Sequence, residues 1–224
     1  MASTFFGLTI AYSGLQAANT SLTITGHNVS NINTKGYTKQ QAGTQAADAL
    51  RTHTTYGAIG SGVVVTEISQ IRDSYYDVKY RNNMANYGQY SVKESYMGQI
   101  EDYLDEFTLN GYSQEYKNFF SAVNQLTITP GDTSAKNQLI NNAKSLADYF
   151  NTLTTNLRNV QADANNEIKD AVQQINSYAK NIAALNRQIN QIEANYGNAN
   201  DLRDKRNAMI DELSEIVNLE TSEE

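Results

Sequence analysis

Apolar side chains recur at a seven-residue spacing through the first thirty residues. Leu8, Leu15, Leu22 and Val29 mark this spacing, and Ala11, Ala18, Thr25 and Ile32 follow three positions later. This is the a/d pattern of a coiled-coil seam, so it predicts a helix with one apolar ridge. Residues 1–34 contain no Asp, Glu, Lys or Arg, whereas a solvated helix face normally carries charge. We therefore expect this helix to be covered on assembly; the alternative is a helix packed on its own domain's core.

An Asn-rich run follows the ridge and predicts the end of this helix. Asparagine competes for backbone hydrogen bonds and tolerates turns, and Gly36 can adopt a positive φ. Residues 38–62 are rich in Thr, Ala, Gln and Gly, which indicates extended or irregular structure. Val63–Val65 predicts a short strand. Glycines at 57, 60 and 62 precede this β-branched run and not a helix, which argues against a dinucleotide site.

The rest of the chain has helical periodicity. From about Ile68 to Phe107 a tyrosine-rich stripe predicts a helix whose aromatic face is used for packing. Its members include Tyr76, Tyr80, Tyr87, Tyr90 and Met97. A short helix, capped by Ser113, should end at Pro130.

A much longer helix is predicted next, from Thr133 to Ala194, with Asp132 or Thr133 as its cap. It would be about 90 Å long if unbroken. Gly197 predicts a turn, and Asp201 is expected to cap a last helix that forms an antiparallel hairpin with the long one.

The predicted fold is mainly α: a long helical coiled coil or bundle with a small extended or β segment near residues 38–70. We expect an axial, inner-tube region at residues 1–66 and a helical bundle at 67–224. The first helix has a seam without an evident partner, and the chain stops just after a hairpin. One absent C-terminal segment would explain both, so we expect a longer protein.

Composition excludes several kinds of chemistry. The 224 residues carry a net charge of −7 and include no Cys and two His, His27 and His53. Thiolate chemistry is therefore absent, the ligands for a structural zinc site are too few, and no basic patch indicates nucleic-acid binding. No long apolar run predicts membrane insertion. We expect no catalytic, cofactor or metal site.

A motif at residues 28–37 gives the most specific signal. The segment Leu22 to Gln40, LTITGHNVSNINTKGYTKQ, contains an Asn-x-x-Asn-x-x-Thr-x-Gly-Tyr core. This core resembles the rod-type motif of flagellar rod, hook and hook-associated axial proteins. Three later stretches resemble, in order, parts of the flagellar hook-associated protein 1 family: GSGV through IRD at 60–73, FFSAVNQLTITPGDTSAKNQL at 119–139, and DLRDKRNAMIDELSEIV at 201–217. Lys136 stands where that family often has Arg.

The resemblance implies a non-enzymatic structural protein that polymerises where the flagellar hook joins the filament. It implies export through the flagellar type III pathway without a cleaved signal peptide, and an extracellular location. The implied partners are further copies of the chain in a ring or tube, the hook protein, a second junction protein or flagellin, and an export chaperone. In the family a C-terminal helix pairs with the N-terminal one. The residues expected at the assembly interface are Leu8, Leu15, Leu22, Val29, Asn28, Asn31, Thr34, Gly36 and Tyr37.

Two alternatives remain. A flagellar rod or hook protein would share the motif at 28–37 but usually becomes β-rich after it. A cytoplasmic coiled-coil adaptor would use the apolar stripe from Ile168 to Ile192 and would stay inside the cell as a discrete oligomer.

Overall fold

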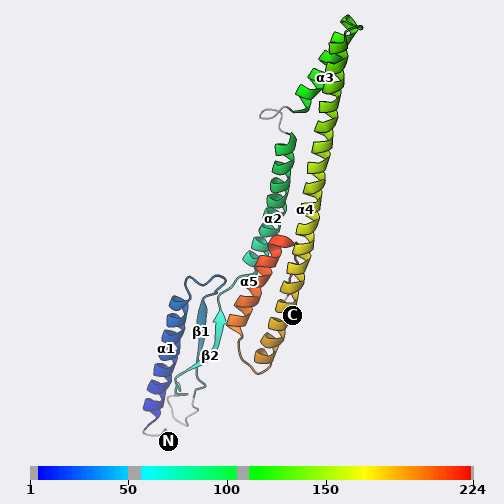
Figure 1. The fold of residues 1–224 in the computed structure, drawn as a ribbon. Helices are drawn as coiled ribbons and strands as arrows, with labels where there is room; N and C mark the ends of the chain where they lie inside the picture. Colours follow the sequence, from blue (N-terminus) through cyan, green and yellow to red (C-terminus); the bar gives the residue numbers. More distant parts are fainter. Residues whose placement is uncertain (1–4, 50–56, 105–110, 223–224) are drawn as a thin grey trace. The chain divides into compact units, whose positions relative to one another are not determined.

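The computed structural model describes residues 5–49, 57–104 and 111–222. Within them lie helices α1 to α5 and strands β1 and β2, so the protein is mainly α with a small β hairpin, as predicted (Figure 1). Their bounds are α1 Phe6–Ser30, β1 Gln40–Ala46, β2 Val63–Gln70, α2 Ser74–Leu104, α3 Tyr112–Ile128, α4 Thr133–Glu193 and α5 Asn200–Ile216.

The chain forms two compact units. Residues 1–85 and 175–224 make the first, and residues 86–174 make the second. The first unit contains α1, the hairpin and α5, so the two ends of the chain share one unit. The boundary near residue 66 between an axial region and a bundle remains a prediction.

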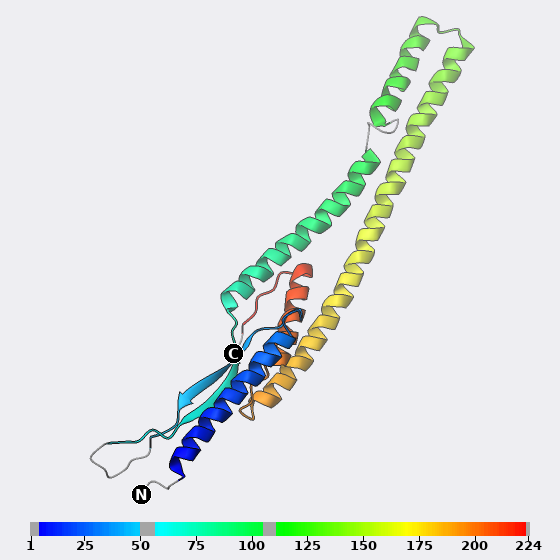
Figure 2. The same cartoon turned by 90° about the vertical axis from the view of Figure 1, so that its left-hand side faces the viewer.

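In the first unit, α1 lies alongside an antiparallel β1–β2 hairpin (Figure 2). The register pairs Gln40 with Gln70 and Ala46 with Val63, with an irregularity between Gly43 and Thr44. Strand β2 continues to Gln70, so the predicted helix from about Ile68 is wrong at its start. Pairing with β1 holds residues 68–70 extended, and α2 begins only at Ser74.

The tyrosine stripe of α2 is exposed in this chain, so the described residues do not supply the packing partner that the aromatic face was predicted to have. Tyr76, Tyr87 and Tyr90 are each exposed by at least 60%. Their spacings of eleven and three residues place them on one face of the helix, but periodicity alone does not provide a second surface for that face to pack against. Phe107, the predicted end of the stripe, lies outside the described residues.

In the second unit, α3 and α4 pack through aromatic side chains. The rings of Tyr112 and Phe150 lie 5.7 Å apart, and Asn142 Nδ2 donates to Asn118 O at 2.9 Å. Helix α3 begins at Tyr112 with Gly111 at its N-cap, so the prediction that Ser113 caps this helix is wrong.

Helix α4 is a continuous 61-residue helix that confirms the prediction for this region. Asp132 caps it, because its Oδ1 accepts the Ser134 N–H at 2.8 Å. Helix α5 begins at Asn200, with Ala199 rather than Asp201 at its N-cap. Asp201 binds a side chain from another segment instead.

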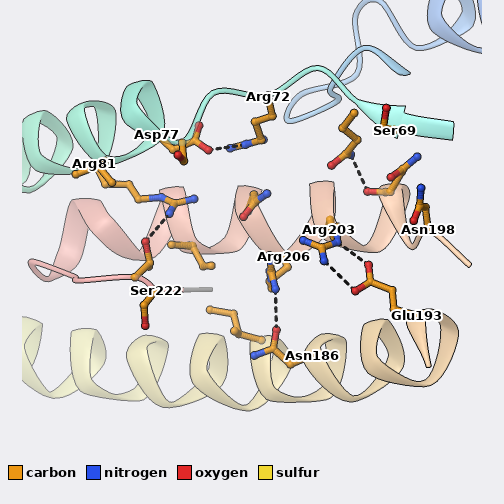
Figure 3. A pocket seen from close by; sticks show the side chains of 18 of the residues that line it. Ser69, Arg72, Asp77, Arg81, Asn186, Glu193, Asn198, Arg203, Arg206 and Ser222 are labelled. Atoms are coloured by element: carbon orange, nitrogen blue, oxygen red, sulfur yellow. Dashed lines mark hydrogen bonds and ion pairs between the residues drawn. The ribbon is translucent and has the colours of Figure 1, made fainter. Parts of the chain in front are cut away.

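Ion pairs connect α2, α4 and α5 in the first unit, and Figure 3 shows the pair between Arg203 on α5 and Glu193 on α4. The Arg81 side chain, 7% exposed, reaches Asp211 at 2.8 Å, and Arg203 Nε lies 2.6 Å from Glu193 Oε1. Arg72 binds Asp77 at 2.6 Å. All of these side chains except that of Asp211 line an open polar groove, and most of its charges are already paired within the chain.

A search of the described helices finds none that is both long enough and apolar enough to cross a membrane. In the same residues, no three His, Asp or Glu side chains come together as potential metal ligands.

Candidate assembly interface

The ridge of α1 is open to solvent. Leu8, Leu15, Leu22 and Val29 are between 65% and 70% exposed, and Ile32, just past the helix, is 77% exposed. The helix contains no Asp, Glu, Lys or Arg to keep this face in water. Four large apolar side chains in one row form an unusual surface for an isolated domain.

A different face of α1 holds the hairpin. Ala17 and Ile24 follow the ridge leucines by two residues, about 200° around the helix, and both are buried. Ser13 Oγ donates to Ile10 O at 2.8 Å and accepts the Val63 N–H at 3.2 Å. The alternative prediction, that α1 packs on the core of its own domain, is thus correct for the face that carries Ala17 and Ile24. The ridge lies on the opposite face.

Asn28 joins the last turn of α1 to the start of β1. Its Oδ1 accepts the backbone N–H of Gln40 at 2.9 Å, and its Nδ2 donates to the carbonyl of the same residue, also at 2.9 Å. The planar amide therefore replaces a neighbouring strand at this edge of the hairpin. Only an amide offers an acceptor and a donor with this reach, because a carboxylate cannot donate to a carbonyl.

The other edge of the hairpin is covered in a similar way. Asn198 and Asn200 both donate from Nδ2 to Ile68 O, at 3.0 and 2.8 Å. Gln70 Nε2 donates back to the carbonyl of Asn200 at 2.9 Å. Side-chain amides thus satisfy backbone groups that would otherwise be an open strand edge.

Tyr37 completes the site around Asn28. Its hydroxyl donates to Asn28 Oδ1 at 2.7 Å, and His27 Nδ1 lies 3.0 Å from the same hydroxyl. Burial, and then the carboxylates of Asp201 and Asp204, raise the pKa of Tyr37. The phenol therefore keeps its proton and remains a donor.

Asn31 and Thr34 close the end of α1. Asn31 donates from its backbone N–H and from Nδ2 to the carbonyl of His27, at 3.1 and 3.0 Å. Thr34 Oγ1 donates to Asn31 Oδ1 at 3.1 Å, and the Thr34 N–H reaches the Asn31 carbonyl at 2.9 Å. These bonds satisfy groups that every helix end leaves open.

Gly36 is required for two reasons. Its φ is +81°, where other residues are strained, and an added Cβ would lie 2.9 Å from Ala208 Cβ. The loop thus passes directly over α5 at this position.

The structure divides the predicted interface residues into two groups. Asn28, Asn31, Thr34 and Tyr37 form one hydrogen-bonded network, and Gly36 lies in the same loop. The ridge residues lie outside it, on the open side of α1. The network consists of amides, hydroxyls and backbone groups, and its bonds hold the conformation of the loop after α1.

The contribution of α5 to this site is not predicted by the sequence. Gln40, Asp201 and Asp204 belong to the site because Gln40 Nε2 donates to Asp201 Oδ1 and the Thr38 N–H donates to Asp204 Oδ2, each at 2.9 Å. The partners are more than 160 positions apart in the chain. The only indication in the sequence is that the carboxylates of Asp201 and Asp204 lie three residues apart. This spacing is equally typical of a solvated helix face.

Comparison with known proteins assigns the family. Residues 97–224 match the model described as "Flagellar hook-associated protein FlgK helical domain". The chain is 32% identical over 227 residues to flagellar hook-associated protein 1 of Bacillus subtilis (strain 168), covering 99% of this chain and 45% of the relative. It is 33% identical to the protein of that name from Salmonella typhimurium, covering 95% and 38%. For Escherichia coli (strain K12) the identity is 31%, covering 95% and 39%.

The chain therefore spans less than half the length of these relatives. The matched region begins inside α2 and includes all of α3, α4 and α5. Because this family model matches more than half of the chain, the protein belongs to the flagellar hook-associated protein FlgK family.

Proposed function

We propose that this protein is a structural component of the bacterial flagellum that assembles, by self-association, at the junction between hook and filament. One observation carries the proposal: the uncharged helix α1 exposes its ridge of Leu8, Leu15, Leu22 and Val29 while its opposite face is already used. The names of its relatives, flagellar hook-associated protein 1, supply the location.

Burying this ridge would drive association. Each large apolar side chain contributes about 1.5–3 kcal/mol when it is fully buried. Identical copies can pack α1 side by side without charge repulsion, because the helix has no ionised side chain. A heterologous contact between identical subunits closes into a ring or continues as a helical tube, which is the kind of assembly a junction requires.

The remaining parts of the proposal follow from the same assignment. The protein would be exported through the flagellar type III pathway without a cleaved signal peptide, guided by a chaperone, and would act outside the cell. Its neighbours would be the hook protein on one side and a second junction protein or flagellin on the other. It would have no enzymatic activity, and would neither bind nucleic acid nor insert into a membrane.

A flagellar rod or hook protein is the second candidate, because the motif at residues 28–37 resembles that wider group. The helical chain from Ser74 onward favours the junction. A cytoplasmic adaptor is the third candidate. Antibody labelling separates them: label at one band between hook and filament supports the junction, label along the hook or rod supports the second candidate, and retention in the cell supports the third.

The direct test replaces two ridge leucines. We expect Leu15→Asp with Leu22→Asp to abolish incorporation into purified flagella, because two carboxylates cannot be buried in an uncharged interface. The matched control, Leu15→Met with Leu22→Met, keeps the apolar surface and should assemble. Circular dichroism should show that both variants keep their helices. Normal incorporation of the Asp variant would reject the proposal.

A further inference from the structure

One face of α5 follows the loop between α1 and β1, contact by contact. Asp201 accepts a hydrogen bond from Gln40 Nε2 at 2.9 Å. One turn further along α5, Asp204 accepts the backbone N–H of Thr38, also at 2.9 Å. Asp204 is only 6% exposed, so this bond lies out of solvent.

The series continues over the next two turns of the helix. Ala208 faces Gly36, where the space left by a missing Cβ lets loop and helix meet. Glu212 then binds Lys35, with Oε1 3.1 Å from Nζ. The chain thus runs from residue 35 to residue 40 while its partners on α5 run backwards from 212 to 201.

Gln40 connects this series to α1. Its backbone N–H and carbonyl bind Asn28 on the last turns of α1, while its side chain binds Asp201 on α5. Gln40 is itself 8% exposed. A continuous path of hydrogen bonds therefore runs from α1 through one residue to α5.

We infer that the face of α5 formed by Asp201, Asp204, Ala208 and Glu212 is a positioning surface for the loop at residues 35–40. Through Gln40 it sets the orientation of α1, with its ridge and the hairpin packed against it, relative to α5. The two motifs that resemble separate family signatures, at 28–37 and 201–217, then form one joint. The positioning needs only the contacts above; its consequence for assembly rests on the proposed function.

The charges around the joint agree with this role. Asp204 Oδ1 lies 4.0 Å from Arg72 Nη1, and Arg72 Nη1 also donates to Thr38 Oγ1 at 3.2 Å. The same loop residue, Thr38, is therefore held through its backbone by α5 and through its side chain by the segment that follows β2.

The test measures the distance between α1 and α5 in solution. Because the chain has no cysteine, spin labels can be placed at Asn19→Cys on α1 and Glu215→Cys on α5, both exposed positions. A second pair, Ala183→Cys and Glu215→Cys, reports on α4 and α5 alone. Pulsed electron paramagnetic resonance then gives a distance distribution for each pair.

We expect Gln40→Ala and Asp204→Ala to broaden the α1–α5 distribution and to raise the population of detached arrangements by about fivefold. The α4–α5 distribution should stay unchanged. Asp204→Asn keeps an acceptor for the Thr38 N–H and should keep the narrow distribution. Lys205→Ala removes an exposed charge from the same helix and serves as the matched control.

Two results would overturn the inference. One is an unchanged α1–α5 distribution in folded Gln40→Ala protein, which remains informative if Asp204→Ala fails to fold. The other is equal broadening of both distributions, which would show general loss of structure. Neither measurement involves flagella, so this failure differs from normal incorporation of the ridge variant, which would reject the proposed function alone.

Discussion

Helices α1 and α5 lie in the same unit and have opposite chemistry. Helix α1 has no charged side chain and leaves a row of large apolar residues open, whereas α5 is highly charged and uses many of its charges inside the chain. Asp204 accepts a backbone N–H, Asp211 binds Arg81 and Arg203 binds Glu193. In this protein the charged helix is therefore the one whose side chains make specific contacts within the chain.

The difference separates side chains that already make contacts within the chain from a surface that remains open. A charge that is buried without a partner is costly, so each buried charge on α5 needs a specific partner and marks a contact already made. An uncharged apolar row needs no particular partner and can wait for a similar surface. Replacements on the two helices should therefore affect different measurements.

The largest expected effect on stability comes from breaking the ion pair between α2 and α5. Asp211→Ala leaves the buried Arg81 guanidinium without its carboxylate and should lower the free energy of unfolding by about 3 kcal/mol. On α1, Leu22→Asp changes a side chain that is 70% exposed and should cost less than about 1 kcal/mol. Urea unfolding measures both; similar losses would contradict the contrast between the helices.

The next effect contrasts a glycine in the loop after α1 with a glycine inside that helix. Gly36→Ala combines a positive φ with a collision at Ala208 and should lower the free energy of unfolding by about 2 kcal/mol. Gly26→Ala lies inside α1 with open space around it and should raise that free energy by about 0.5–1 kcal/mol. Thermal unfolding of the two variants should move the midpoint in opposite directions.

A smaller loss is expected when the amide at the end of α1 is removed. Asn28→Ala leaves the N–H and carbonyl of Gln40 and the hydroxyl of Tyr37 without this partner, which should cost about 1.5 kcal/mol. Asn28→Asp keeps the acceptor and places a carboxylate oxygen against the Gln40 carbonyl. Amide hydrogen exchange at Gln40 should therefore speed up strongly in the Ala variant and only partly in the Asp variant. Equal protection in all three proteins would show that Asn28 does not cover this edge.

The smallest effect depends on pH. The hydrogen bond from Arg203, offset in part by burial, lowers the pKa of Glu193 below its ordinary value of 4.5. The unfolded chain then takes up this proton more readily than the folded protein. The stabilising contribution is complete above the ordinary pKa and is lost as the pH falls through the lower folded value.

We therefore expect Glu193→Gln to be less stable than the parent protein at about pH 7, and we expect this difference in stability to shrink as the pH is lowered through and below the ordinary pKa of glutamate. Urea midpoints at pH values above and below that pKa measure it. Glu215→Gln on the exposed side of α5 is the matched control for the removal of one carboxylate. A constant difference for Glu193→Gln across these pH values would contradict the assignment.

The sequence by itself determined the helices, because periodicity acts locally. The seven-residue spacing of α1, the long apolar stripe of α4 and the capping carboxylate of Asp132 are each readable within a few turns. It also determined which face of α1 is the ridge, because the large apolar side chains recur every seven residues. The absence of charge from this helix is visible in composition alone.

Only the tertiary structure decided what those faces meet. The tyrosines of α2 have the spacing of a packed face and are nevertheless exposed, while Ile68–Gln70 follow a helical pattern and are held as a strand by β1. Asp201 has the position of a cap and instead binds Gln40, a residue 161 positions away. Contacts between distant segments depend on how the chain returns on itself, and local spacing contains no information about that path.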